Sequence, residues 1–442
     1  MNKVVPSLLW VDDFWKQAGK YIFCREDDGV LILPPNRVYK INKTGAKLIA
    51  FLKNGGKAAG LAGTEHYSHI EGFFKTLSDI YGGNDALPPG NVKRIPFDFD
   101  YTRLPVLGEI AVTYRCNNRC LFCYAGCGGR GTDAGELSTV DWKRVITIFK
   151  NDAKIPFFSF SGGEPLLRPD LEKLIKYASD MGFFVNLVSN GTLADRGRAA
   201  SLYRAGLRTA QISLEAPGPE YHDALAGRKG AFAETLGGIR ALADAGVSVQ
   251  TNTTITRKNA ALVPDMPEFL ASLCRRSGGR IITRFAMNMY IPGTGPGLRE
   301  DLFVGYDEIG TVVDEVRRKA FLSGMSFYWY SPTPFCHYNP IARGMGNKSC
   351  AAADGLVSVA PDGNILPCSS WNEPLGNILS KRFGDIWFSG QALLLKHKNA
   401  APVSCRACSS FTACQGACPL YWRACGTGLL EHAACHEYGS GA

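Results

Sequence analysis

Cysteine spacing most limits how this 442-residue chain can fold. Three of its fifteen cysteines cluster at Cys116, Cys120 and Cys123, and most of the others follow from Cys336 onward. So many thiols indicate either a disulfide-bonded secreted protein or a metalloprotein of the reducing cytoplasm. Two aspartates interrupt the apolar run near the N-terminus and no small-residue cleavage site follows it, unlike a secretory signal. We therefore expect a cytoplasmic protein whose cysteines bind metal.

The bulk composition describes a large globular chain with a mild positive charge. Hydrophobic residues make up 45% of it, which is enough for a sizeable core. The chain has 49 Lys and Arg against 40 Asp and Glu, a formal net charge of +9. This excess fits an anionic partner and does not by itself indicate nucleic-acid binding. No uncharged apolar stretch is long enough to span a bilayer, so we expect neither a membrane nor a nucleic-acid partner.

The sequence predicts four segments, at 1–95, 96–106, 107–331 and 332–442. The first reads as a small strand-and-helix domain, and the prolines of the second indicate a linker. In the third, six apolar or β-rich runs alternate with helical patterns, which predicts an α/β fold, a partial (β/α)6 TIM-like barrel. The fourth is rich in Gly, Pro and Cys, so bound metal is expected to order it. The six runs are 108–115, 157–161, 183–189, 209–214, 248–255 and 280–286.

The first cysteine group follows the end of the first run with the spacing C-x3-C-x2-C. Three thiolates on one loop can bind three irons of a [4Fe–4S] cubane and leave the fourth iron open to a substrate. A zinc site would need a fourth ligand, which Cys127 could supply. Because function in parallel α/β sheets gathers at the carboxyl ends of strands, this place suits a reactive centre.

Together with Ser161-Gly162-Gly163-Glu164 after the second run, this spacing resembles the radical S-adenosylmethionine (SAM) superfamily over roughly residues 108–300. The resemblance implies that the open iron binds SAM, which is cleaved to a 5′-deoxyadenosyl radical that abstracts a substrate hydrogen. For Ser213 and Arg228, an ordinary polar role in a loop is the alternative. The positions that the resemblance assigns to SAM contact are Phe122, Ser161, Gly162, Gly163, Glu164, Asn190, Ser213 and Arg228.

The second cysteine set resembles the SPASM extension of radical SAM enzymes over about 336–436. The match consists of C-x12-G-x4-C, then C-x2-C-x5-C-x3-C and a trailing cysteine, whereas a zinc ribbon would explain only one C-x2-C pair. It implies two auxiliary [4Fe–4S] clusters, and so three clusters in all. The first auxiliary cluster would use Cys350, Cys368 and Cys418, with Cys336 as the candidate fourth ligand. The second would use Cys405, Cys408, Cys414 and Cys435.

Four cysteines are left without a ligand role. Spacing from Cys418 favours Cys435 over Cys425 as the trailing ligand. By default each of the four is expected to be a buried thiol. They are Cys24, Cys127, Cys274 and Cys425.

Residues 1–95 resemble the winged-helix peptide-recognition domain typified by PqqD of pyrroloquinoline quinone biosynthesis. The matching features are the strand region Leu31–Ile41, the helix entry Asn42–Gly45 and a Gly55-Gly56 stop. Such domains bind the leader of a precursor peptide as an added strand. The basic stretch from Arg37 to Lys57 suits an acidic leader, although a solvated helix face would also explain it.

The three parts together resemble the radical SAM–SPASM maturases of ribosomally made peptides. We therefore expect a precursor peptide with an acidic leader as substrate and an electron donor such as flavodoxin or ferredoxin. The product could be a crosslink, a thioether or a related change. Two alternatives stay open: maturation of a folded protein, such as a sulfatase or metalloenzyme, and modification of haem or another small molecule.

Overall fold

The chain folds into two compact units, Met1–Val106 and Leu107–Ala442. The boundary falls at the end of the segment that the sequence suggests as a linker. Within the residues described, no helix combines the length and apolar character needed to cross a bilayer. The computed structural model describes residues 7–33, 37–82, 101–127, 135–276, 282, 284–294 and 299–431.

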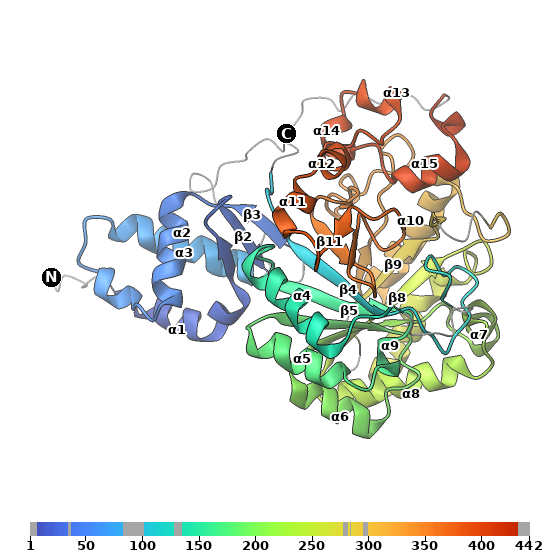
Figure 1. The fold of residues 1–442 in the computed structure, drawn as a ribbon, viewed down its shortest axis with the longest axis horizontal. Coiled ribbons are helices and arrows are strands. Elements are labelled where there is room, and N and C mark those ends of the chain that lie inside the picture. Colours follow the sequence, from blue (N-terminus) through green and yellow to red (C-terminus); the bar gives the residue numbers. More distant parts are fainter. Residues whose placement is uncertain are drawn as a thin grey trace. The chain divides into compact units, whose positions relative to one another are not determined.

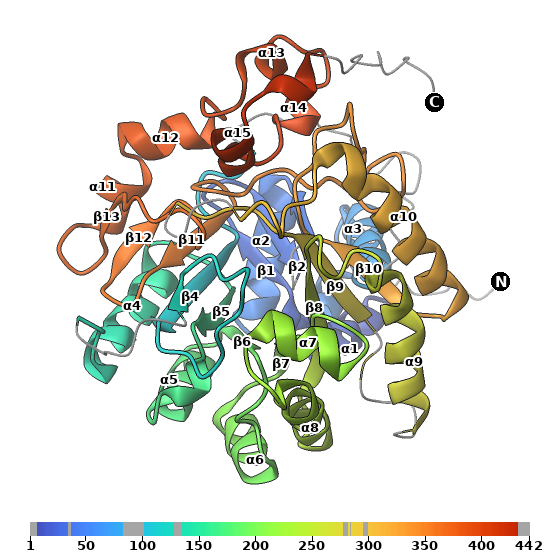
Figure 2. The same cartoon turned by 90° about the vertical axis from the view of Figure 1, so that its right-hand side faces the viewer.

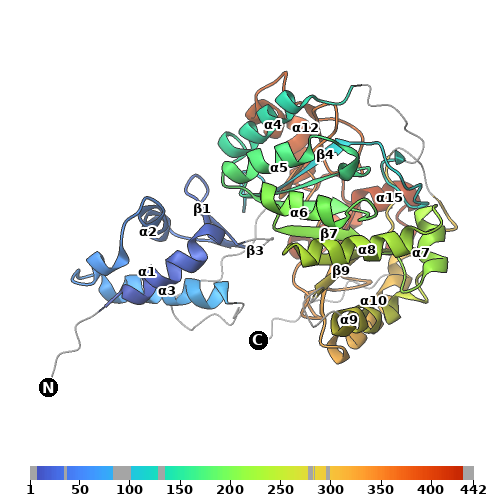
Figure 3. The ribbon, with the colours of Figure 1, turned by 90° about the horizontal axis from the view of Figure 1, so that it is seen from below.

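The first unit combines a three-stranded antiparallel sheet, in the order β1-β2-β3, with three helices (Figure 3). Helix α2 begins where the sequence predicts, because the Asn42 side chain accepts a hydrogen bond from the Gly45 N–H at 2.7 Å. Apolar side chains such as Ile49 and Phe74 form the core. The sequence pattern missed α1 and the three-residue β1. The elements are α1 (Leu9–Ala18), β1 (Phe23–Arg25), β2 (Val30–Leu33), β3 (Arg37–Lys40), α2 (Lys43–Lys53) and α3 (Tyr67–Tyr81).

The second unit is built on a sheet in which seven consecutive parallel strands, β4 to β10, curve beneath a layer of helices (Figures 1 and 2). This confirms the partial TIM-like barrel, with one strand more than the six predicted. The seventh, β10, is only four residues long, too short for a periodic signal. The strands are β4 (Leu107–Thr113), β5 (Phe157–Gly162), β6 (Phe184–Ser189), β7 (Thr209–Ser213), β8 (Ser248–Ile255), β9 (Arg284–Met289) and β10 (Ser326–Trp329).

The helices between these strands cover one face of the sheet and bury apolar stripes against it. Helix α5, for example, buries Leu171, Leu174, Ile175 and Ala178, which recur at helical spacing. The helices are α4 (Thr139–Asn151), α5 (Leu171–Asp180), α6 (Arg196–Ala205), α7 (Pro219–Ala226), α8 (Ala231–Asp244), α9 (Met266–Arg276) and α10 (Tyr306–Leu322).

The opposite, concave face of the sheet is polar. In β8, Val249 and Thr251 are buried, while the intervening Gln250 and Asn252 are only half-buried. The Asn252 side-chain amide donates to the Asn288 side-chain oxygen at 2.8 Å, a contact between β8 and β9. Strands of a parallel sheet that is buried on both faces are apolar throughout. The polar face therefore lines the inside of the barrel.

The cysteine-rich region continues the same sheet and then becomes largely irregular, as its sequence predicts. Strand β11 pairs in parallel with β4, and β12 and β13 follow in antiparallel order. The rings of Tyr306 and Tyr421 stack with centroids 3.7 Å apart, which joins this region to α10. Its elements are β11 (Leu356–Val359), β12 (Asn364–Leu366), β13 (Gly376–Asn377), α11 (Phe383–Trp387), α12 (Gly390–Lys396), α13 (Val403–Arg406), α14 (Phe411–Cys414) and α15 (Pro419–Cys425).

A buried ion pair should stabilise the first unit. Arg25 pairs with Asp28 at 2.8 Å and donates to the carbonyls of Leu104 and Pro105. We expect Arg25→Ala to lower the free energy of unfolding of this unit by about 3–5 kcal/mol, because the Asp28 carboxylate and two carbonyls lose their donor. Urea denaturation followed by hydrogen exchange in residues 7–82 measures this. Lys16→Ala, at an exposed pair, is the control and should change nothing measurable.

Candidate functional site

The first cysteine group lies on a loop that leaves the carboxyl end of β4. Backbone N–H groups of Arg119 and Leu121 donate to carbonyls at the end of α7, each at 2.9 Å, and so hold the loop. Two further N–H groups point at sulfur. The Asn118 N–H donates to the Cys116 Sγ at 3.4 Å, and the Cys127 N–H donates to the Cys123 Sγ at 3.5 Å. Donors of this kind suit thiolates that ligate iron.

Burial and hydrogen bonds shift the pKa values of the three thiols in different directions. Burial raises the pKa of Cys116 to about 11 and that of Cys120 well above its usual value. The pKa of Cys123 is lowered to about 6, mainly by a hydrogen bond with the Cys127 side chain. Because metal binding displaces the thiol protons, iron would replace them at all three positions.

The arrangement of the three thiols is compatible with a cluster. Among the described residues, no three His, Cys, Asp or Glu side chains lie close enough together to hold one metal ion. The thiolates of a cubane bind different irons and need not converge on one point. Cys116, Cys120 and Cys123 still lie near enough to influence one another's pKa.

Two backbone segments approach each other closely at the end of β5, and this approach requires the glycines Gly162 and Gly163. The Gly163 N–H donates to the Thr113 carbonyl and the Glu164 N–H to the Arg115 carbonyl, both at 2.8 Å. A Cβ on Gly162 would overlap with the carbonyl oxygen of Thr113, and one on Gly163 with that of Arg115. The Gly-Gly step therefore positions the start of the cysteine loop, whatever ligand it also meets.

Glu164 is a buried carboxylate that organises the neighbouring strand end. It accepts hydrogen bonds from the Leu166 N–H, the Ser189 hydroxyl and the Asn190 N–H, at 2.8–2.9 Å. Burial raises its pKa, while these donors favour the charged form. Three of about four acceptor positions of a carboxylate are thus taken by the protein itself.

Asn190 links this strand end to the cysteine loop. Its side-chain amide donates to the Asn117 oxygen at 2.9 Å, and Asn117 donates in turn to the Thr192 hydroxyl at 2.8 Å. The structure therefore brings the predicted Asn190 beside the loop. Asn117 was not singled out from the sequence, although it lies inside the cysteine motif.

Arg228 also reaches the loop, through Asn118. Its Nε donates to the Asn118 side-chain oxygen at 2.7 Å, and its terminal nitrogens pair with Glu234. Ser213 ends β7 on the same edge of the sheet, and Phe122 lies half-buried on the loop. Seven of the eight predicted SAM-contact positions thus fall on the cysteine loop or at the carboxyl ends of β5, β6 and β7, and Arg228 lies on the turn between α7 and α8. Their contact with SAM stays a prediction.

The predicted ligands of the first auxiliary cluster come together. Burial raises the pKa of Cys368 well above its usual value and that of Cys418 to about 12, and the charge of Cys350 adds to both shifts. The Cys418 N–H donates to the Tyr306 hydroxyl at 3.3 Å, which ties the group to α10. Three cysteines separated by up to 68 positions therefore meet at one place.

The second auxiliary group is described in part. Cys405, Cys408 and Cys414 belong to one short stretch, and Cys435 lies outside the described residues. The segment that carries Cys336 contacts this group: the backbone N–H of its neighbour Phe335 donates to the Cys414 Sγ at 3.4 Å. The assignment of Cys336 to the first auxiliary cluster stays a prediction.

The cysteines without a ligand role differ in exposure. Cys127 is buried as expected, and Cys24 and Cys274 are half-buried. Cys425 is exposed, so its expected burial is wrong. It lies at the end of the short helix α15, where the chain turns toward solvent.

Two carboxylates lie inside the barrel, and sequence reasoning missed one of them, Glu109. Glu215 lies two residues after the end of β7, where burial raises its pKa to about 8 and the Thr254 N–H donates to it. Glu109 lies in the middle of β4, and the Ser161 hydroxyl donates to it at 2.6 Å. The sequence signal that could have identified Glu109 is a single acidic residue inside an apolar run.

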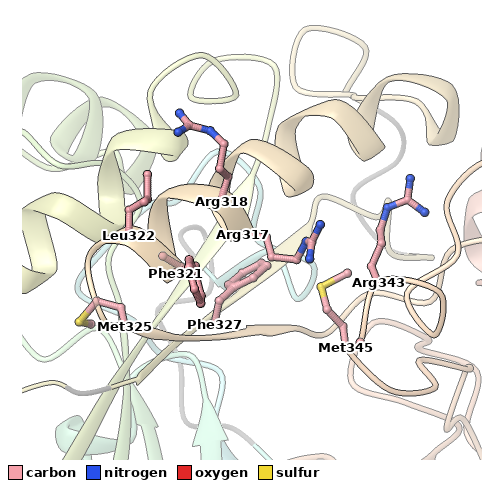
Figure 4. A pocket seen from close by; sticks show the side chains of 10 residues that line it. Arg317, Arg318, Phe321, Leu322, Met325, Phe327, Arg343 and Met345 are labelled. Atoms are coloured by element: carbon pink, nitrogen blue, oxygen red, sulfur yellow. The ribbon is translucent and has the colours of Figure 1, made fainter.

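A separate pocket opens at the α10 and β10 edge of the barrel (Figure 4). It has a volume of about 480 Å³ and is lined by Phe321, Met325, Phe327 and three arginines, among others. None of the predicted site residues lines it. It is therefore not part of the cysteine centre.

Comparison with known proteins agrees with this geometry. Residues 110–259 match the radical SAM superfamily, and residues 350–409 match the SPASM iron–sulfur cluster-binding domain. An AdoMet-dependent heme synthase of Oleidesulfovibrio alaskensis is 29% identical over 62% of this chain and 72% of its own. The PqqA peptide cyclase of Gluconobacter oxydans is 27% identical over 69% of this chain and 82% of its own.

Streptococcus suis SuiB is a similar solved structure. It is 16% identical, with a TM-score of 0.67, over 90% of this chain and 95% of SuiB. SuiB has also been solved bound to a precursor peptide, SuiA. At this identity the likeness establishes a shared fold.

The close backbone approach makes Gly163 a sensitive position. We expect Gly163→Ala to displace the cysteine loop, because the new Cβ meets the Arg115 carbonyl. Anaerobically reconstituted variant protein should lose about four irons, one cubane's worth. Gly237→Ala in α8, where a Cβ meets open space, is the control and should keep the wild-type iron content. Equal iron in both variants would contradict this role.

Proposed function

The chain belongs to the radical SAM superfamily and carries a SPASM iron–sulfur domain, and we propose that this enzyme modifies a ribosomally made precursor peptide. The superfamily uses SAM and a [4Fe–4S] cluster, which together supply a carbon-centred radical. Cys116, Cys120 and Cys123 would hold that cluster. We further propose two auxiliary clusters, so three in all.

The chain's own residues would position the reactants. The Gly162-Gly163 step holds the start of the cysteine loop against β5. Glu164 and Asn190 connect the ends of β5 and β6 to the same loop. A preorganised pocket of this kind reduces the entropic cost of bringing two reactants together.

The observation that carries the peptide proposal is the N-terminal unit. The fold likeness to SuiB, whose structure with a precursor peptide is known, extends over 90% of the chain. The curated relatives align over only 62–76% of it. Within the described residues β3 pairs in the sheet with β2 alone, so an added peptide strand could extend the sheet along β3.

Two exposed lysines on α2, the helix that follows β3, suit an acidic leader. Lys43 and Lys47 lie exposed on α2. Lys40 is less available, because its ammonium donates to the Asp28 carbonyl at 2.6 Å and lies over the ring of Tyr101. Arg37 donates to the Ile80 carbonyl at 2.6 Å. We therefore assign leader recognition to Lys43 and Lys47.

A second candidate is modification of haem or another small molecule. It is supported by relatives named AdoMet-dependent heme synthase, which are 27–29% identical to this chain. In either case a low-potential donor such as flavodoxin or ferredoxin would supply the electron for SAM cleavage. Dependence on the N-terminal unit distinguishes the two candidates.

SAM cleavage should depend on the first cysteine group alone. Replacing Cys116, Cys120 and Cys123 with Ala should abolish 5′-deoxyadenosine formation under dithionite and lower iron from about twelve to about eight per chain. The matched control replaces Cys274, whose thiol hydrogen-bonds the Ile282 carbonyl, and should keep both values. Undiminished 5′-deoxyadenosine from the triple variant would reject the assignment.

Leader recognition should act at a distance from the chemistry. Deleting residues 1–106 should leave SAM cleavage without peptide intact, while modification of a synthetic precursor peptide with an acidic leader falls steeply, because its local concentration drops. Lys43→Glu with Lys47→Glu should weaken binding of a labelled leader, and wild-type affinity should fall with salt. Fluorescence titration measures both.

Lys75→Glu, on an exposed lysine of α3 that pairs with Glu71, is the matched charge control. It should bind the leader more tightly than the double variant. If the truncated and full-length enzymes modified the peptide equally, the leader model would be rejected. The haem candidate would then gain support.

A further inference from the structure

Glu109 is an acid in the middle of a central strand. Its neighbours in β4, Gly108 and Ile110, are buried, whereas Glu109 is surrounded by protein and yet keeps part of its surface accessible. Both conditions hold for a side chain that lines an enclosed space reached by solvent. Glu109 therefore belongs to the polar inner face of the barrel.

The contacts of Glu109 place it between the two cysteine centres. The Ser161 hydroxyl, at the start of the Ser-Gly-Gly-Glu segment, donates to it at 2.6 Å. A second hydrogen bond comes from Ser369, which follows Cys368 directly. Tyr124, which follows Cys123, lies near enough for the Glu109 charge to raise its pKa. A molecule that reaches both centres would pass this carboxylate.

No cation accompanies Glu109 in the described part of the chain. Its ionised form is held only by two neutral hydroxyl groups, and burial raises its pKa. A buried charge without an opposite charge is expensive. Two hydroxyl donors also leave about half of a carboxylate's acceptor positions unused. The site therefore has unused acceptor positions and a negative charge without a partner, and both suit a cationic donor.

We propose that Glu109 binds an organic cation that enters the barrel. On the proposed function, that cation is a Lys or Arg side chain of the precursor peptide or the positive end of SAM. The shared chemistry is an ammonium, guanidinium or sulfonium group that neutralises the buried carboxylate. If the cation belongs to the peptide, Glu109 selects which residue of the substrate lies between the two centres.

Glu109→Gln tests this, because an amide keeps an acceptor for Ser161 and Ser369 but removes the charge. The first arm measures the KM for SAM in dithionite-driven cleavage without peptide. The second measures the KM of a synthetic precursor peptide that contains Lys or Arg, and of the same peptide with each Lys or Arg changed to Gln. Iron content confirms that the variants are intact. Glu373→Gln, an exposed carboxylate that contacts Trp371 and Arg423, is the control.

We expect Glu109→Gln to raise the KM of the cation it binds by about tenfold or more, as loss of a charge-assisted contact does. Glu109→Asp, which keeps the charge, should restore part of the affinity. A raised KM for SAM assigns the site to SAM. A raised KM for the peptide alone assigns the site to the peptide. The residue that it binds is the Lys or Arg whose change to Gln abolishes the KM difference between the Glu109→Gln and wild-type enzymes.

The proposal would be overturned if the Glu109→Gln enzyme matched the wild type in both arms. This includes the case in which neither enzyme modifies the peptide and both have the same KM for SAM. Failure of the proposed function looks different. In that case the wild type itself would not modify the peptide, while the SAM arm would still report on Glu109. If the Glu109→Gln protein is iron-deficient, the Glu109→Asp protein is used instead. The proposal would equally be overturned if Glu109→Asp had wild-type KM values for the peptides whose Lys or Arg is changed to Gln.

Discussion

The close approach of the Gly162-Gly163 backbone to the segment Thr113–Arg115 is the constraint on which the rest of the site depends. The two N–H···O bonds between these segments require that neither glycine carry a Cβ. They determine where the cysteine loop leaves the sheet. The place where the loop leaves the sheet in turn fixes the positions of the loop's sulfurs. It also fixes the Asn117–Asn190 and Asn118–Arg228 contacts. A change of one methyl group here would therefore act on several residues at once.

The polar concave face of the barrel sets the chemistry that the site can accept. Amides on β7, β8 and β9 pair with one another across strands, as in the bond between Gln250 and Gln211. Such paired amides hold their shape without a ligand. Glu109 differs, because its charge has no opposite charge nearby among the described residues. A surface of paired amides with acids that lack a cation among the described residues, Glu109 and Glu215, favours a substrate that brings polar groups and a positive charge.

The cysteine-rich region shows a different source of order. Its helices are short, and it is joined to the barrel by the β4–β11 pairing and by the stacking of Tyr306 on Tyr421. Cys350, Cys368 and Cys418 meet although they are far apart in sequence. Bound clusters would close long loops here, which is the case in which a crosslink stabilises a chain most.

Much of the architecture could be predicted because its signals are local. Alternating runs predicted the parallel strands and helices, and the spacing of Cys116, Cys120 and Cys123 predicted one loop. The four residues of β10 carry no period, so the seventh strand could not be predicted. The Asn42 cap marked the start of α2 because a cap acts within one turn.

Residue types and local spacing indicate which cysteines could ligate iron and which periodic elements would carry them. The contacts of Glu109 with Ser161 and Ser369, of Phe335 with Cys414, and of Lys40 with Asp28 emerge only in the folded chain. A residue type or a period can be read within a few neighbouring positions. Burial, charge balance and contact depend on segments brought together from tens to hundreds of positions away, and no local pattern records them.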